Sequence, residues 1–169
     1  MKLKNKFIIS MFVLILIGMV VVTSWYRHTD PLIDDGLQEV SYQGGGQKEY
    51  VIQFRNEGYG KIDIISVKTN GETPATVQLG VSYDSAALVQ VLPDSDQAIK
   101  FMDIRAASIY PKLSVKEFHE ALEKKVHTPI HYGLRIRYDK QPIERVTIRY
   151  KYLGFTKVKI ITRWFNDGK

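Results

Sequence analysis

The sequence predicts a mainly β protein: an N-terminal transmembrane helix followed by an antiparallel β-sandwich, with one helix inserted near residues 114–126. Three observations support this prediction. Residues 7–22 contain no charged side chain. Most segments after residue 48 alternate apolar and polar residues with a period of two, which is typical of half-buried strands. Turn-forming sequences separate these segments at short intervals, as they do in antiparallel sandwiches.

The N-terminal segment has the composition of a membrane anchor. Three lysines precede the apolar run, and Trp25 and Tyr26 follow it, where aromatic rings collect at membrane interfaces. With these flanks, residues 7–26 reach the roughly 20 residues that a spanning helix needs. The lysines favour a cytoplasmic tail over residues 1–6. A cleaved signal peptide has the same cationic and apolar regions, so secretion after cleavage is the alternative. Both interpretations place the rest of the chain outside the cytoplasm.

The segment between the anchor and the first strongly alternating stretch is polar and rich in glycine and acids. We expect residues 27–47 to form a stalk, with at most a short strand near residues 37–42. The three consecutive glycines at 44–46 would act as a flexible hinge, because no lysine and helix follow them as in a phosphate-binding loop. The folded domain is then expected over residues 48–166.

Strands are expected where apolar residues alternate with polar ones or where short apolar runs lie between turns. The predicted strands cover residues 50–55, 61–68, 76–83, 87–92, 99–104, 132–138, 143–153 and 156–165. The turn-forming sequence at 56–60 predicts that the first two of these strands form a hairpin.

One segment departs from the β pattern. Ser114 and Glu117 have the spacing of a capping box, and Leu113 and Phe118 that of a hydrophobic staple around it. A single apolar face at helical spacing is formed by Val115, Phe118, Leu122 and Val126. The pattern predicts a helix of about three turns that ends before Pro129.

The first predicted hairpin, YVIQFRNEGYGKIDIISVKTNG (residues 50–71), resembles the opening hairpin of bacterial immunoglobulin-like modules. In those modules an apolar strand ends in an Asn-x-Gly turn and returns as Ile-x-Ile. The resemblance covers about twenty residues and implies a β-sandwich. Such modules serve adhesion, spacing, carbohydrate contact and assembly. The helix at 114–126 departs from their pattern.

The sequence lacks the residues that most classes of catalytic and metal site require. The chain has no cysteine, which excludes disulfides, cysteine nucleophiles and thiolate metal sites. It has four histidines, but no Gly-x-Ser-x-Gly sequence places a serine for attack. His127 and His131 are four residues apart, yet Pro129 prevents the regular helix that would align their rings. We therefore expect no catalytic residue, no metal site and no cofactor.

The last third of the chain is strongly basic: residues 112–169 contain fourteen cations and six acids. If the last three strands are neighbours, eight cations share one face, where like charges would repel unless they bind something. The predicted contact residues are Arg135, Arg137, Arg145, Arg149, Lys151, Lys157, Lys159 and Arg163. The alternative is that they only form the solvent side of a sheet and limit edge aggregation.

These observations predict a non-enzymatic binding or assembly module in the cell membrane, with its folded domain outside the cytoplasm. Suitable partners of the cationic face are an anionic lipid, a phosphate-rich wall polymer or an acidic protein. Nucleic acid is excluded by the location. One alternative function is an accessory or sensor subunit that docks to another membrane protein. An exported hydrolase is disfavoured, because the sequence offers no nucleophile, base or metal constellation.

Overall fold

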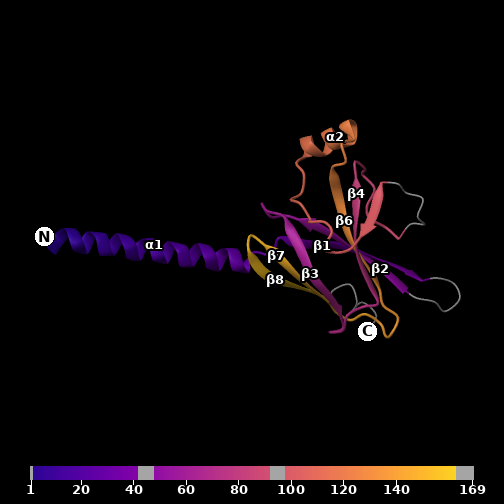
Figure 1. Cartoon of the computed structure of the whole chain (residues 1–169), viewed down its shortest axis with the longest axis horizontal. Coiled ribbons are helices and arrows are strands. Elements are labelled where there is room, and N and C mark those ends of the chain that lie inside the picture. The colour runs from indigo at the N-terminus through magenta and orange to yellow at the C-terminus, as the bar shows by residue number, and fades with distance from the viewer. Residues whose placement is uncertain (1, 42–47, 92–97, 163–169) are drawn as a thin grey trace. The chain divides into compact units, whose positions relative to one another are not determined.

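A computed structural model describes residues 2–41, 48–91 and 98–162 of the chain (Figure 1). The chain divides into two compact units, Met1–Asp30 and Pro31–Lys169. The first unit contains the helix α1, and the second contains eight strands and the helix α2 among the described residues. Each unit is described by itself.

Helix α1 runs over Lys2–His28, which confirms a helix in the N-terminal apolar segment. Large apolar side chains are exposed along consecutive positions, so that no side of the helix is polar between residues 8 and 22. These side chains are Ile8, Ile9, Met11, Phe12, Val13, Leu14, Ile15, Leu16, Ile17, Met19, Val20, Val21 and Val22. In the part of the chain that the structure describes, no helix meets the length and hydropathy needed to cross a membrane.

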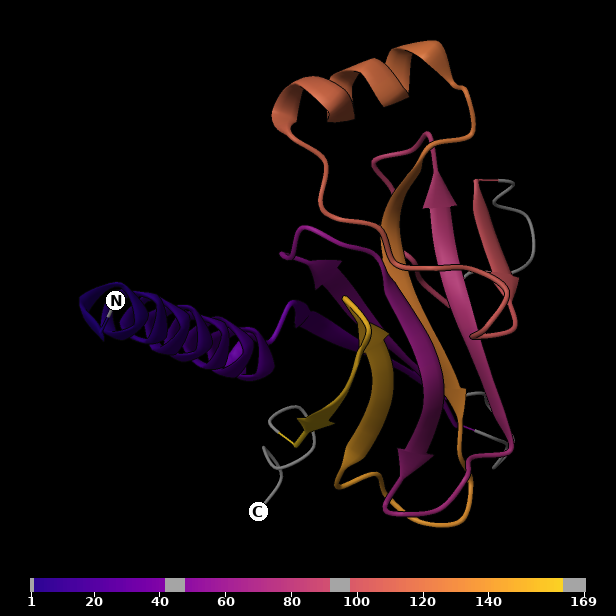
Figure 2. The same cartoon turned by 60° about the vertical axis from the view of Figure 1, so that its left-hand side comes forward.

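The second unit consists of two antiparallel sheets, which confirms a mainly antiparallel β fold (Figures 1 and 2). The five-stranded sheet has the order β1 (Leu32–Ser41), β2 (Lys48–Asn56), β6 (Pro129–Arg137), β4 (Thr76–Tyr83) and β5 (Ile99–Met102). The three-stranded sheet has the order β3 (Ile62–Thr69), β7 (Val146–Tyr152) and β8 (Phe155–Ile161). Helix α2 (Val115–Lys124) lies at one end of the domain, beyond the ends of the strands (Figure 2).

The hydrophobic core lies between the two sheets. Ile52 and Leu134 come from the five-stranded sheet, Ile64 and Ile148 from the three-stranded sheet, and all four belong to one buried cluster. Strand β7 illustrates the pattern, because its residues alternate between buried and solvent-facing positions along the whole strand. Two facing sheets that share one apolar core are the arrangement of a β-sandwich.

The strand predictions are mostly confirmed, with one exception. The predictions over 50–55, 61–68, 76–83 and 132–138 correspond to β2, β3, β4 and β6. Those over 99–104 and 143–153 contain the shorter strands β5 and β7, and the one over 156–165 overlaps β8, which begins at Phe155. The predicted strand at 87–92 is wrong for its described residues 87–91, which form no strand.

The exception is explained by a small second core on the outer face of the five-stranded sheet. Val89 is fully buried, although its segment makes no strand ladder. It packs over Gly80 and Gly133, which are direct partners on β4 and β6. The Gln53 side-chain amide donates a hydrogen bond to the Val89 carbonyl oxygen. The apolar run around Val89 therefore covers a sheet instead of joining it.

The prediction of a stalk is wrong for residues 32–41. Strand β1 pairs with β2 along its whole length, from Leu32 opposite Asn56 to Ser41 opposite Lys48, with a register shift near Gly36. Leu32 and Asp34 are buried. The acids and the glycine hide the alternation of this strand in the sequence. The predicted hinge at 44–46 lies outside the described residues.

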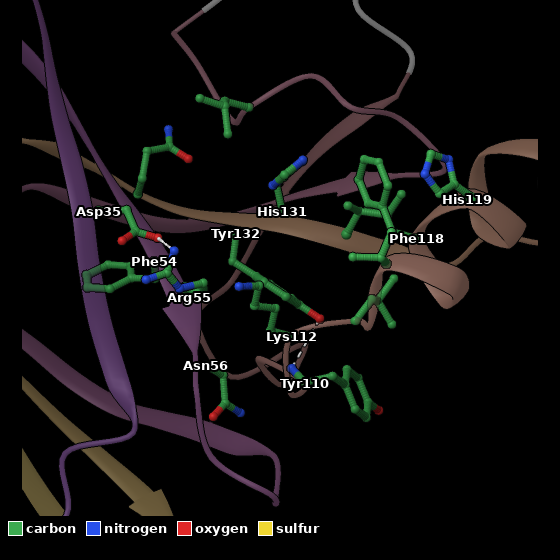
Figure 3. Close-up of a pocket in the computed structure, with 15 residues that line it drawn as sticks. Asp35, Phe54, Arg55, Asn56, Tyr110, Lys112, Phe118, His119, His131 and Tyr132 are labelled. Atoms are coloured by element: carbon green, nitrogen blue, oxygen red, sulfur yellow. Dashed lines mark hydrogen bonds and ion pairs between the residues drawn. The ribbon is translucent and has the colours of Figure 1, made fainter.

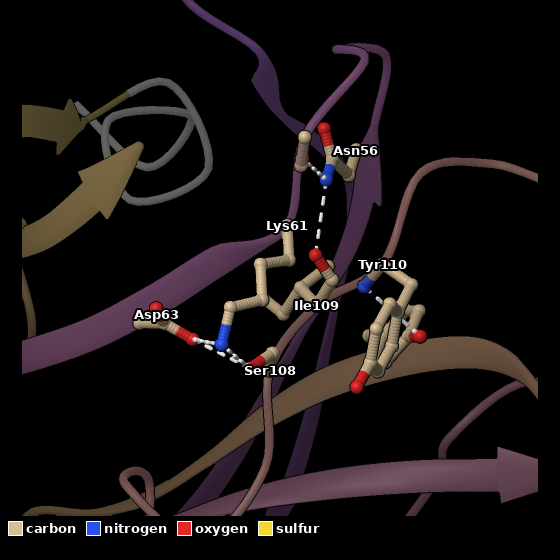
Figure 4. Close-up of polar contacts among 8 residues, drawn as sticks. Asn56, Lys61, Asp63, Ser108, Ile109 and Tyr110 are labelled. Carbon is tan, nitrogen blue, oxygen red and sulfur yellow. Dashed lines mark hydrogen bonds and ion pairs between the residues drawn. The ribbon is translucent and has the colours of Figure 1, made fainter. Parts of the chain in front are cut away.

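The predicted hairpin of the first two strands is also wrong. Strand β2 pairs with β1 and β6, whereas β3 pairs with β7 in the other sheet. The segment between them crosses from one sheet to the other, and the buried side chain of Asn56 holds the crossing. Its amide nitrogen lies 2.8 Å from the Gly60 carbonyl oxygen and 3.0 Å from that of Ile109 (Figure 4). Its amide oxygen accepts a hydrogen bond of 2.9 Å from the Gly58 nitrogen.

The inserted helix and its capping box are confirmed. The Ser114 hydroxyl accepts a hydrogen bond from the Glu117 backbone, and the Glu117 carboxylate accepts one from the Ser114 backbone. The helix ends at Lys124, followed by Lys125 in the left-handed conformation. The predicted apolar face is only partly correct, because Val115 and Val126 are 77% and 70% exposed.

Candidate functional site

The eight predicted contact cations do not share one face. Strand β6, which carries Arg135 and Arg137, belongs to the five-stranded sheet, whereas β7 and β8 belong to the other sheet. The prediction of one cationic surface assumed that the three strands are neighbours. That assumption is wrong, because β6 pairs with β2 and β4 on its two sides.

Arg135 and Arg137 bind an acid of their own sheet. The Glu49 side chain is only 2% exposed, and it accepts two hydrogen bonds from Arg135, of 3.0 and 3.2 Å. It also accepts a hydrogen bond from Nε of Arg137, the residue directly opposite on β6. Burial raises the pKa of Glu49, but the two arginines outweigh this effect and hold the pKa below its ordinary value. The guanidinium of Arg135 also lies over the Phe101 ring, 4.7 Å from its centroid.

The cations of the three-stranded sheet divide between its two faces. Arg149 and Lys151 are exposed on the outer face of β7. Lys157 and Lys159 lie opposite the buried residues Tyr150 and Ile148, so they share the inner face. Val158 and Ile160 take the outer positions on β8, where they are 56% and 57% exposed. Alternation alone had predicted the reverse orientation for β8.

Lys159 has an acidic neighbour between the sheets. Its ammonium nitrogen lies 3.1 Å from Oδ1 of Asp34 on β1, and the two side chains are 15% and 8% exposed. Arg145 precedes β7 and is exposed. Arg163 lies outside the described residues. Of the predicted set, only Arg145, Arg149 and Lys151 are therefore exposed cations among the described residues.

An apolar hollow lies next to α2. It is a pocket of about 570 Å³, shown in Figure 3. Its walls come from β1, β2, the start of β6, α2 and the segments that precede β5 and α2. The lining residues are Asp35, Gln53, Phe54, Arg55, Asn56, Leu88, Tyr110, Lys112, Leu113, Val115, Phe118, His119, Ile130, His131 and Tyr132.

The charged residues at the pocket are paired with one another. Arg55 has its guanidinium 3.4 Å from the Asp35 carboxylate and 2.5 Å from that of Glu57. The Lys112 ammonium lies 3.8 Å from the same Glu57 carboxylate. Two cations and two acids therefore form one chain of ion pairs. The formal charges of these four residues cancel at this side of the pocket.

The neutral polar groups of the lining are held by the fold. Tyr132 accepts a hydrogen bond of 3.1 Å from the Tyr110 backbone nitrogen, and burial raises the pKa of Tyr132 to about 12. Asn56 binds the crossing segment described above, and the Gln53 amide nitrogen binds Val89. These groups maintain the shape of the pocket.

His131 differs from these residues. Its ring is partly buried and lies edge-on to the Phe118 ring, with 6.4 Å between centroids. Burial lowers the pKa of His131, which favours the neutral ring. In the described part of the chain, no hydrogen bond to the imidazole nitrogens is found. The pocket wall thus contains a neutral donor and acceptor among apolar side chains.

Sequence reasoning missed this pocket. The sequence predicts a helix staple for Leu113 and Phe118, and it draws attention to His131 only through its spacing from His127. The usable signal was the position of the helix, which begins shortly after Tyr110 and ends just before the apolar start of β6. The described residues contain no group of three or more side chains able to hold a metal ion. A second, polar hollow is lined by Asn70, Gln141, Pro142, Glu144, Arg145 and Thr162.

Comparison with known proteins adds no relative: no family model, no curated protein and no solved structure matches the chain.

Proposed function

We propose that the protein is a non-enzymatic, membrane-tethered binding module of immunoglobulin-like architecture, and that the pocket beside α2 is its ligand site. In this proposal the folded domain lies outside the cytoplasm, and α1 associates with the lipid bilayer. The alternative for α1 is a signal peptide that is removed after export.

The strand order supports the immunoglobulin-like architecture. If β5 is set aside as an addition, seven strands remain among the described residues of the domain. The first, second, fifth and fourth then form one sheet, and the third, sixth and seventh form the other. This is the A-B-E-D and C-F-G order of constant-type immunoglobulin sandwiches. The crossing from β2 to β3 then corresponds to the passage between the sheets after strand B.

The exposure of α1 supports the tether. A helix that is apolar on all sides is stable where lipid or protein replaces water around it. Fully exposing a large aliphatic side chain instead of burying it costs about 1.5–3 kcal/mol. Alkaline carbonate extraction of membranes from cells that express the full chain tests the tether. The chain should stay in the membrane pellet. Its release into the supernatant would contradict this part of the proposal.

The observation that carries the binding function is the apolar pocket with exposed apolar residues at its rim. Leu88, Tyr110 and Val115 line the pocket and are themselves exposed. The volume of about 570 Å³ lies in the range of small-molecule sites, roughly 300–1,000 Å³. A ligand that covers these side chains would remove apolar surface from water, which favours binding.

A matched pair of variants tests the site. Val115→Trp introduces a bulky ring at the pocket rim, whereas Val126→Trp introduces it at a similarly exposed valine outside the lining. The probe is 2-naphthol, added to the full chain in lipid nanodiscs and followed by NMR shifts of pocket amides. Binding should be lost in Val115→Trp and kept in Val126→Trp. Equal binding by both variants would contradict the proposed site.

The exposed cations support binding of an anionic partner less strongly than the pocket supports binding of a small molecule. Arg149 and Lys151 remain on the outer face of β7, but Asp63 lies directly opposite Lys151 on β3.

The alternative function, an accessory subunit of another membrane protein, is tested by crosslinking in intact membranes. This alternative requires one stoichiometric protein partner, and the capture of that partner should not depend on the pocket variants.

A further inference from the structure

We infer that the pocket beside α2 selects an uncharged, mainly aromatic or aliphatic small molecule with one hydrogen-bonding group, and that His131 binds this group. The inference rests on the proposed function, because it names the ligand class of the same site. It depends on three features of the pocket: the ion pairs between its charged residues, the imidazole nitrogens of His131 in its wall, and its size.

The charges argue against an ionic ligand. Asp35, Arg55, Glu57 and Lys112 already pair with one another at distances of 2.5–3.8 Å. A carboxylate or ammonium that enters the pocket would either compete with these pairs or lose its water without a counter-ion. Moving an unpaired charge into an apolar environment is strongly unfavourable. An uncharged molecule avoids both effects.

The polar groups of the lining favour a hydrogen bond at His131. The amide of Asn56 is fully used by the crossing segment, and the Tyr132 hydroxyl accepts from Tyr110. His131 lies among Phe118, Ile130 and Tyr132 in the lining, with the titratable groups of Asp35, Arg55, Lys112 and His119 around the same pocket. Its neutral ring offers one donor and one acceptor. A hydroxyl or carbonyl group on the ligand can use either nitrogen.

The dimensions favour a small molecule over a protein segment. The lining includes the aromatic residues Phe54, Phe118 and Tyr132, which come from β2, α2 and β6 (Figure 3). Aromatic rings prefer stacked or edge-on neighbours, as the Phe118 and His131 rings already do. A compact ring system with one polar substituent matches this combination.

The test compares four probes that share one ring system: naphthalene, 2-naphthol, 2-naphthoate and 2-naphthylmethylamine. Binding of each probe to the full chain in nanodiscs is measured by equilibrium dialysis. Parallel dialysis with protein-free nanodiscs corrects for partition of the probe into lipid. We expect 2-naphthol to bind about fivefold more tightly than naphthalene, the effect of one hydrogen bond. The naphthoate anion and the ammonium probe should bind at least about tenfold more weakly than 2-naphthol.

The role of His131 is tested with His131→Phe, which keeps an aromatic ring and removes both nitrogens. In this variant 2-naphthol and naphthalene should bind equally, while naphthalene keeps its parental affinity. His131→Gln provides a second variant, which retains a donor and an acceptor and should restore part of the preference. His127→Phe is the matched control at an exposed histidine outside the lining, and it should leave the preference unchanged.

The outcomes separate this inference from the proposed function. Equal binding of charged and uncharged probes, with loss in Val115→Trp, would overturn the ligand class and leave the binding site in place. A preference for 2-naphthol that survives in His131→Phe would overturn the role of His131. Failure of all four probes to bind, or binding that ignores Val115→Trp, would overturn the proposed function as well.

Discussion

The ammonium group of Lys159 on β8 lies 3.1 Å from the carboxylate of Asp34 on β1, in the space between the two sheets. Each residue belongs to an edge strand of its own sheet. The ion pair therefore joins the two sheets at one open side of the sandwich. It also explains why a lysine can occupy an inward position opposite Ile148.

Asp34→Asn removes the carboxylate from this pair and leaves the inward ammonium in place. Breaking one partner of a largely buried pair is expected to lower the free energy of unfolding by about 3 kcal/mol. The double change Asp34→Leu with Lys159→Met replaces both charges by apolar groups and should recover most of the loss. Urea unfolding of the full chain in detergent micelles measures both effects. Lys151→Met, on the outer face, is the control and should have little effect.

Glu49→Gln should destabilise the five-stranded sheet in a similar way. It leaves the guanidinium groups of Arg135 and Arg137 without the carboxylate that both contact. We expect a loss of about 3 kcal/mol in the free energy of unfolding. Glu39→Gln, at the exposed pair with Lys48, is the matched control on the neighbouring strand and should change stability little. Comparable effects of the two changes would show that the ion pairs of Glu49 with Arg135 and Arg137 stabilise the protein no more than an exposed ion pair does.

Gly133→Ala should disrupt the packing of Val89 on the outer face of the five-stranded sheet. A Cβ atom at residue 133 would lie 2.8 Å from Cβ of Val89 and 3.1 Å from Cγ1 of Val51. Such overpacking typically costs about 1–3 kcal/mol. Gly36→Ala has open space around the new methyl group and serves as the control. Addition of Val89→Ala should relieve part of the clash, and thermal unfolding of the three variants measures whether it does.

The lowered pKa of His131 predicts a pH dependence of stability. Because burial favours the neutral ring, the unfolded chain takes up this proton at a higher pH than the folded chain. Stability is therefore lost as the pH falls below the unfolded value of about 6.5. Between pH 7 and about 5, the free energy of unfolding should fall less steeply in His131→Gln than in the parent. An unchanged slope would contradict this role of His131.

Local patterns in the sequence predicted most strands and the capped helix, because alternation and capping act over a few residues. Ser114 and Glu117, for example, make the contacts that their spacing indicates. Pairing between distant segments could not be predicted in the same way. The position of β6 between β2 and β4 decides that Arg135 and Arg137 face Glu49. The inward orientation of Lys159 depends on the register of β8 with β7 and on Asp34, more than a hundred residues earlier.

The pocket depends even more on distant segments. Phe54 on β2, Tyr110 before α2 and Ile130 on β6 line the same hollow. Each residue alone has an ordinary local context, so no motif marks it. His131 becomes distinctive only when burial changes the protonation equilibrium of its ring.

The order of the strands has a kinetic consequence. The central strand of the five-stranded sheet is β6, which follows β2 by more than seventy residues. Until residue 137 has been synthesised and released, β2 and β4 each lack their shared neighbour. Contacts between segments so far apart form slowly, because long loops must close first. During synthesis the chain therefore passes through a period with unsatisfied strand edges, in which chaperone binding or aggregation competes with folding.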